Sequence, residues 1–234
     1  DPEIGRQAAE ESREEIVNVL RGAQIAEAQD QEKAGGSGMK HFVITLTRQF
    51  ASQGRSIAQA MSRELGINFY DRDIVEATAS RLGLPVREVS DAEDTHSQSF
   101  FRSIYPLGTG NLSLQDELFQ TQSNIIKDLA ARESCIIVGR CADAVLRERA
   151  DVLNIRVYAP YEHRLWVCTT QLGMDERTAK KMIERVDRSR EQYHREYGGC
   201  EPDHLSHILI NSARFTVPEA ASTLCGIARQ WFEL

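Results

Sequence analysis

From Met39 onward, short apolar segments alternate with amphipathic ones, and this alternation constrains the fold more than any other feature of the sequence. Such an alternation is typical of an α/β fold, in which a parallel sheet is covered by helices on both faces. The apolar segments predict strands at 41–46, 67–70, 135–138, 152–158 and 206–210. The amphipathic segments predict helices at 56–65, 72–82, 113–132, 142–149, 161–172, 175–195 and 216–232. Residues 86–113 show no clear period and predict a mobile insertion.

The segment before Met39 differs in composition from the rest of the chain. Residues 1–34 are rich in Glu, Ala, Gln and Arg, which favours a mostly polar helix. A flexible Gly-Gly-Ser-Gly linker at 35–38 then leads directly into Met39. This junction favours an engineered fusion segment over residues 1–38, followed by a folded domain over 39–234; a natural extension is the alternative. If the segment is engineered, its helix is a candidate for a protein partner's peptide, tethered to the surface that binds it.

Charge and cysteine usage exclude several classes of function. The net charge is −7, of which −5 falls in residues 1–38, so the body of the chain is close to neutral. Sequence-independent binding to nucleic acid calls for a basic face, which this balance does not indicate. The five cysteines lack the spacing of a zinc site and favour a reducing compartment. No apolar run approaches the ~20 residues that span a membrane, so we expect a cytoplasmic protein.

Residues 49–56, between the first predicted strand and the first predicted helix, resemble a phosphate-binding loop. Such a loop has the pattern G-x-x-x-x-G-K-S/T, and its backbone N–H groups hold an anion. Gly54 and Ser56 match this pattern, whereas Gln49 replaces the first Gly and Arg55 replaces the Lys. For this stretch alone, an ordinary strand–turn–helix is the alternative interpretation.

Arg140 is a second candidate for phosphate binding. It follows Gly139 directly after a buried strand, at the edge of the sheet where such folds bind ligands. The planar guanidinium fork suits a phosphate. A structural ion pair with Asp71 or Asp143 is the alternative.

A row of basic residues in the helix predicted at 175–195 is the third candidate. Arg185, Arg188 and Arg190 are interrupted by Asp187, and a Tyr/Gly-rich stretch at 193–199 follows. This pattern predicts a flap with a glycine hinge that closes basic side chains over a polyphosphate. A solvated helix face is the alternative.

Several of these segments together resemble the cytidylate kinase-like proteins, a branch of the nucleoside monophosphate kinases. Residues 136–143 (Ile-Ile-Val-Gly-Arg-Cys-Ala-Asp) are similar to the V-I-V-G-R-C-A-D of that family, and 69–74 (Phe-Tyr-Asp-Arg-Asp-Ile) to its F-Y-D-x-x-I. Residues 47–58 resemble the family's S-R-x-x-G-S-G-G-R-x-I-G opening, 185–194 its K-x-D-x-x-R-x-x-Y-Y lid, and 210–212 its L-N-S/T. The resemblance covers essentially all of 39–234.

The resemblance implies a fold and an activity. The fold is a P-loop three-layer sandwich of the nucleoside monophosphate kinase type, with a five-stranded parallel sheet in the order 2-3-1-4-5 and a helical lid. The activity is transfer of the γ-phosphoryl group of ATP, with Mg²⁺, to a small-molecule nucleotide, CMP or dCMP by analogy. The implied donor-phosphate ligands are Ser52, Gln53, Gly54, Arg55 and Ser56, with Ser56 also facing Mg²⁺. Asp71, Arg140 and Asp143 would bind the acceptor, and Arg55, Arg140, Arg185, Arg188 and Arg190 would act on the transferred group. Such chemistry needs positioning and charge neutralisation but no nucleophilic side chain.

Two departures from the pattern keep other functions open. Arg55 is bulkier than the Lys of active P-loop kinases. Ala51 and Gln53 replace glycines of the family's loop, and side chains there would crowd a nucleotide if the backbone needs positive φ. One alternative is therefore a catalytically impaired relative that binds a nucleotide or a protein partner. Another is a kinase for a different small acceptor, with the 86–113 insertion shaping the pocket.

Overall fold

The computed structural model describes residues 41–83 and 114–234. The chain divides into two units, 1–40 and 41–234, and the description falls entirely within the second. The expectations for residues 1–38, including their helix and its partner, lie outside the described residues, as does the insertion predicted at 86–113. These expectations stay predictions.

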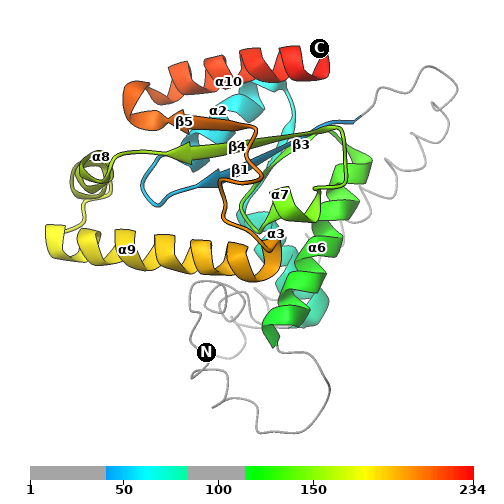
Figure 1. Cartoon of the computed structure of the whole chain (residues 1–234), viewed down its shortest axis with the longest axis horizontal. Helices are drawn as coiled ribbons and strands as arrows, with labels where there is room; N and C mark the ends of the chain where they lie inside the picture. Colours follow the sequence, from blue (N-terminus) through cyan, green and yellow to red (C-terminus); the bar gives the residue numbers. More distant parts are fainter. Residues whose placement is uncertain (1–40, 84–113) are drawn as a thin grey trace, which may run out of the picture. The chain divides into compact units, whose positions relative to one another are not determined.

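A parallel sheet of five strands forms the centre of the described unit, in the order β2-β3-β1-β4-β5 (Figure 1). The predicted α/β class and the predicted strand order are confirmed. All four strand pairings are parallel. The middle strands are buried on both faces, which explains why their sequences are almost continuously apolar. The strands are β1 (Val43–Arg48), β2 (Asn68–Tyr70), β3 (Cys135–Val138), β4 (Val152–Tyr158) and β5 (Ile208–Asn211).

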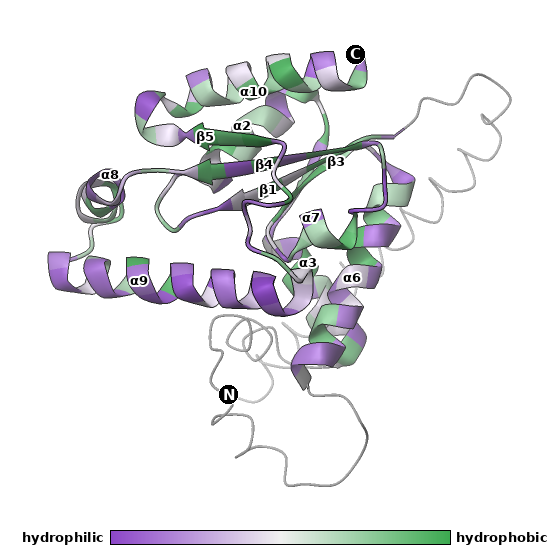
Figure 2. Ribbon diagram, in the orientation of Figure 1, coloured by the Kyte–Doolittle hydropathy of each residue, from purple (hydrophilic) through white to green (hydrophobic). Residues whose placement is uncertain are grey.

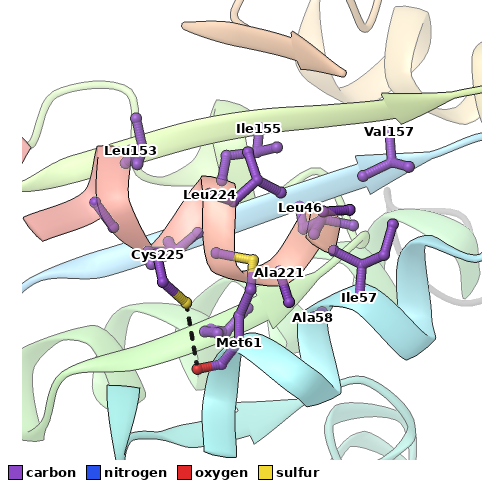
Figure 3. Packing of buried hydrophobic residues seen from close by; sticks show 14 of the residues in the cluster. Leu46, Ile57, Ala58, Met61, Leu153, Ile155, Val157, Ala221, Leu224 and Cys225 are labelled. Atoms are coloured by element: carbon purple, nitrogen blue, oxygen red, sulfur yellow. Dashed lines mark hydrogen bonds between the residues drawn. The ribbon is translucent and has the colours of Figure 1, made fainter. Parts of the chain in front are cut away.

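Helices α2 (Gly54–Leu65) and α10 (Val217–Phe232) cover one face of the sheet (Figure 1). Figure 3 shows Leu46 of β1 packed between side chains of both helices, such as Ile57 and Leu224. These side chains are fully buried, and their removal from water is the main force that holds this layer to the sheet.

A second layer of helices covers the other face. It consists of α3 (Arg72–Leu82), α6 (Leu114–Arg132) and α7 (Ala142–Val145). Ile126 of α6 and Ile137 of β3 belong to its buried core. The helix expected at 142–149 ends early at Val145, and the chain continues in turns toward Asp151, whose carboxylate pairs with Arg149.

The remaining helices lie beyond the carboxyl ends of the central strands. Helix α8 (Tyr161–Trp166) continues as a π-helical turn at Val167–Gln171, and α9 (Glu176–Tyr193) continues as another at His194–Gly198. Figure 2 shows that α9 is mostly hydrophilic, with few apolar positions along its length. Its buried Ile183 packs in a small cluster that also includes Phe50 of the loop after β1. None of the described helices is long and apolar enough to cross a membrane.

Candidate active site

The loop between β1 and α2 adopts the compact geometry of an anion-binding nest. Ala51 and Gln53 both have left-handed φ angles, of 59° and 60°. Left-handed residues alternating with right-handed ones turn successive backbone N–H groups toward one side, as in phosphate-binding loops. Two hydrogen bonds tie the loop to β4: the Gln49 N–H donates to the Val157 carbonyl at 3.1 Å, and the Ser52 hydroxyl donates to the same carbonyl at 3.3 Å.

Gly54 begins α2, and the lack of space around it, rather than its backbone angles, requires a glycine at this position. A Cβ on this residue would lie 2.7 Å from the Cβ of Arg48 and 3.3 Å from a methyl carbon of Leu46. Atoms at these distances overlap, so a side chain would push α2 away from β1. The second glycine of the loop pattern therefore has a specific physical role in this chain.

The loop residues expected to hold donor phosphates differ in exposure. Ser52 and Gly54 are buried, whereas Arg55 and Ser56 are exposed in the first turn of α2. Gln53 hydrogen-bonds Gln171, with 2.9 Å between amide nitrogen and oxygen. The first N–H groups of a helix have no partner within the helix, so this turn can donate to an anion.

A cavity of about 370 Å³ opens beside the loop, at the carboxyl ends of β1 and β3. Its walls come from β1 and β4, from α2, α3 and α9, and from the turns after β3 and before β5. Among the described residues, Asp71 is the only acid that lines it. Five arginines line it as well, namely Arg48, Arg55, Arg140, Arg156 and Arg190. A cavity with this balance attracts anions strongly, because charges interact more strongly where water is partly excluded.

Asp71 links the loop to the cavity. Its carboxylate accepts a hydrogen bond from Arg55 Nε at 2.8 Å and pairs with Arg48 Nη2 at 3.4 Å. Arg55 is the residue at the position of the P-loop lysine, and 66% of its side chain is exposed. In this structure the cation of the donor loop is therefore held by a carboxylate of the cavity.

The turn after β3 is unusual in its backbone. Gly139, Arg140 and Cys141 all have positive φ angles, of 77°, 58° and 51°. Such angles are costly for residues other than glycine and cluster at functional sites. Gly139 lies directly against the guanidinium of Arg48, where any side chain would overlap it. This tight turn places Arg140 in the wall of the cavity.

Asp143 lies behind the cavity wall and does not line it. Its carboxylate is buried and pairs with His194, with 2.8 Å between Oδ2 and Nε2. The other ring nitrogen of His194 lies 2.9 Å from the carbonyl oxygen of Cys200. Both partners are acceptors, and the ring can donate to both of them only when it is protonated. Burial lowers the pKa of His194, but Asp143 and the Cys200 carbonyl raise it by more, so the net pKa lies above its usual value.

The arginines of α9 divide into two groups. Arg190 lines the cavity and donates to the Arg48 carbonyl at 3.1 Å, whereas Arg185 and Arg188 are exposed and do not line it. Asp187 bonds the Phe50 N–H at 2.7 Å and also pairs with the buried Arg164. This helix is thus docked onto the loop through Asp187 and Arg190. The predicted flap at 193–199 is packed as well, with Tyr197 stacked on Phe119 at 4.4 Å between ring centroids.

Two arginines of the cavity were not among the residues singled out in the sequence. Arg48 ends β1 inside the loop motif, and Arg156 lies in the interior of β4. A basic residue within an otherwise apolar strand is a signal that could have indicated Arg156, because a charge is rarely buried without a partner.

ATP and Mg²⁺ fit the residues around the loop. A loop with two left-handed residues and a glycine too close to β1 for any side chain matches a phosphate cradle. Ala51 and Gln53 occupy the left-handed positions, so the condition under which their side chains would crowd a nucleotide is met, and a catalytically impaired relative stays an alternative. The exposed hydroxyl of Ser56 is a suitable Mg²⁺ ligand, since this ion is usually bound by one or two protein groups together with substrate phosphates.

The comparison with known families agrees with this geometry. The model of the cytidylate kinase-like family matches residues 43–214, which is most of the chain, and the chain belongs to this family. Membership in a kinase-like family supports phosphoryl transfer to a small substrate. No curated protein matches the sequence.

The chain is similar to solved structures at low sequence identity, and the first of those named below shares its fold. An uncharacterized protein from Eubacterium ventriosum ATCC 27560 is 20% identical, with a TM-score of 0.58, over 82% of this chain and 99% of that one. A shikimate kinase from Acinetobacter baumannii is 10% identical, with a TM-score of 0.48, over 81% and 94% of the two chains. A gluconokinase from Sinorhizobium meliloti 1021 is 13% identical, with a TM-score of 0.45, over 84% and 98%.

Proposed function

We propose that this protein transfers the γ-phosphoryl group of ATP to a nucleoside monophosphate, with CMP as the first candidate. The observation that carries the proposal is the cavity lined by five arginines directly beside a phosphate-binding loop. A donor site and an anion-attracting acceptor site side by side are what phosphoryl transfer between two phosphorylated molecules requires. The family to which the chain belongs favours cytidylate as the acceptor.

In this proposal the loop 49–56 binds the donor through its backbone and Arg55. Bound ATP would supply the phosphoryl group, and Mg²⁺ held in part by Ser56 would neutralise the charge of its phosphate oxygens. Arg140 would bind the phosphate of the acceptor, and Asp71 would accept a hydrogen bond from its sugar or base. Arg190 would neutralise charge between the two sites. Since the chemistry is one of positioning, no nucleophilic side chain is needed.

The ion pair between Arg55 and Asp71 adds a step to binding. Arg55 can turn to the donor phosphates only when it leaves the Asp71 carboxylate, 2.8 Å away. An acceptor that hydrogen-bonds Asp71 would compete for the same oxygen and release Arg55. We therefore expect donor and acceptor to bind cooperatively. A kinase that draws on cellular ATP in this way would work in the cytoplasm.

The test is consumption of ATP by the full chain, with Mg²⁺, in the presence of separate nucleoside monophosphates and of small acceptors without phosphate. The proposal predicts turnover with CMP that exceeds turnover with water alone and with phosphate-free acceptors. Turnover with a phosphate-free acceptor and none with any nucleotide would contradict it and favour a kinase for a different small molecule. Binding of CMP and an ATP analogue without turnover would indicate the catalytically impaired relative.

A further inference from the structure

Arg156 is a charged residue in the interior of a buried strand. It lies on β4 next to Thr47 of β1, with which it is in register, and only 9% of the residue is exposed. Both residues line the cavity. Its side chain pairs with Asp203, in the turns before β5, and 57% of the Asp203 side chain is exposed. Burial of a guanidinium is costly unless it binds an anion, and an exposed carboxylate is a weak partner because water screens it.

Arg156 and Arg190 lie on a different side of the cavity from Arg140. Both line the cavity and also a small neighbouring hollow beside Gln49, which Arg140 does not line. Arg140 follows β3, whereas Arg156 is on β4, and β1 lies between these two strands. Neighbouring strands are about 4.8 Å apart, so the backbones of β3 and β4 are separated by about 10 Å. The backbones of Arg140 and Arg156 therefore lie on opposite sides of β1.

The polar lining between the two sides also indicates a ligand. The Thr47 hydroxyl oxygen is buried and has no hydrogen-bond partner within the described part of the chain. Two positions earlier on the same face of β1, the Thr45 hydroxyl donates to Asn154 at 2.7 Å. A buried hydroxyl without a partner costs free energy, which a bound anion beside Arg156 would recover by accepting its hydrogen bond.

We propose that Arg156, with Arg190 and Thr47, forms a second anion subsite, and that the natural acceptor carries a second anionic group in addition to the phosphate bound near Arg140. The inference rests on the proposed function, because it assigns the cavity to the acceptor. It narrows the substrate class to small molecules with two separated anionic groups, such as nucleoside bisphosphates. The second group is a phosphate or a carboxylate.

The experiment compares two ligands by calorimetric titration into the full chain: cytidine 5′-monophosphate and cytidine 3′,5′-bisphosphate. A charge-assisted contact contributes about 1.5–3 kcal/mol, so the bisphosphate should bind roughly ten- to a hundredfold more tightly. In Arg156→Met this preference should disappear, while the affinity for the monophosphate stays within about twofold. In Asp203→Asn the preference should increase, since Arg156 loses its competing carboxylate. Arg185→Met, which changes an exposed arginine that does not line the cavity, is the matched control.

Equal affinity for the two ligands, or a preference that survives in Arg156→Met, would overturn the inference. So would a preference that decreases in Asp203→Asn, because Arg156 would then serve only to hold the turn before β5. If neither nucleotide binds, the proposed function fails. Titration with inorganic phosphate then tests whether the subsite at Arg156 binds an anion. The Arg156 Nε–H signal in NMR spectra should then shift with phosphate, and an unchanged signal would overturn the inference.

Discussion

The loop proposed to bind the donor and the cavity proposed to bind the acceptor lie side by side, but they are built in opposite ways. The loop 49–56 depends on backbone geometry: two left-handed residues, a glycine packed against β1 and the free N–H groups of a helix start. The cavity depends on side chains, since arginines from the ends of β1 and β3, from the interior of β4 and from two helices converge there. We therefore expect the loop to be sensitive to any substitution that alters its backbone conformation. In the cavity, loss of one charged side chain should weaken the binding of only the ligand group that it contacts.

Asp187→Ala should have the largest effect, because this residue holds α9 to the loop. It bonds the Phe50 N–H and pairs with Arg164, whose side chain is buried. Removing one partner of a buried pair leaves an uncompensated charge and costs about 3–5 kcal/mol. Chemical denaturation should show this loss of unfolding free energy. Glu176→Ala, which breaks the exposed pair with Lys180, is the control and should change the unfolding free energy far less, because water screens an exposed pair. A similar loss in both variants would show that α9 is not docked through Asp187.

Gly54→Ala tests the backbone character of the loop. The new Cβ would overlap Arg48, and such overpacking costs about 1–3 kcal/mol. We expect weaker binding of an ATP analogue and nearly unchanged binding of CMP, measured by calorimetry. Gly226→Ala, in α10 with open space around it, should leave stability unchanged or raise it slightly. Normal ATP-analogue binding in a folded Gly54→Ala protein would contradict the account of the loop.

The buried pair of His194 and Asp143 makes the cavity wall sensitive to pH. The pKa of His194 is raised on folding, so the protonated ring stabilises the fold below the ordinary value of 6.5. This contribution is lost as the pH rises through the raised pKa. The unfolding free energy of the wild type should therefore fall across that range more steeply than that of His194→Gln. Exposed His204→Gln is the control. Parallel pH profiles for wild type and His194→Gln would show that the ring is neutral in the fold.

Arg55→Lys should have the smallest effect. Lysine keeps the positive charge at the position where P-loop kinases carry one, so ATP consumption with CMP and Mg²⁺ should stay similar or rise. Lysine also lacks the guanidinium Nε through which Arg55 bonds Asp71. Its side chain should therefore leave Asp71 more easily and turn to the donor phosphates. A drop of a hundredfold or more would show that Arg55 makes a forked contact that lysine cannot replace.

The sequence predicts the fold far better than it predicts the site. The hydrophobic pattern of the sequence predicts the strands and helices, because burial on two faces imposes apolar runs such as that of β3, whereas the order of the strands was predicted from the family resemblance. The π-helical turn at His194–Gly198 is missed, since its backbone pattern has no sequence period of its own. Arg140 could be predicted as a cavity residue from its position after a strand. The cavity position of Arg156, and the exposure of Arg185 and Arg188, depend on which face of a strand or helix meets a neighbour.

The most direct test of the account is titration of CMP and of an ATP analogue into Arg140→Ala. Arg140 lies in the cavity wall, and the loop contacts come from a different segment. Loss of one charge-assisted contact costs about 1.5–3 kcal/mol, so CMP affinity should fall roughly ten- to a hundredfold while the ATP analogue binds nearly as before. Arg188→Ala, an exposed arginine of α9, is the matched control and should change neither affinity. Unchanged CMP affinity in Arg140→Ala, or an equal loss for both ligands, would contradict the division into a donor loop and an acceptor cavity.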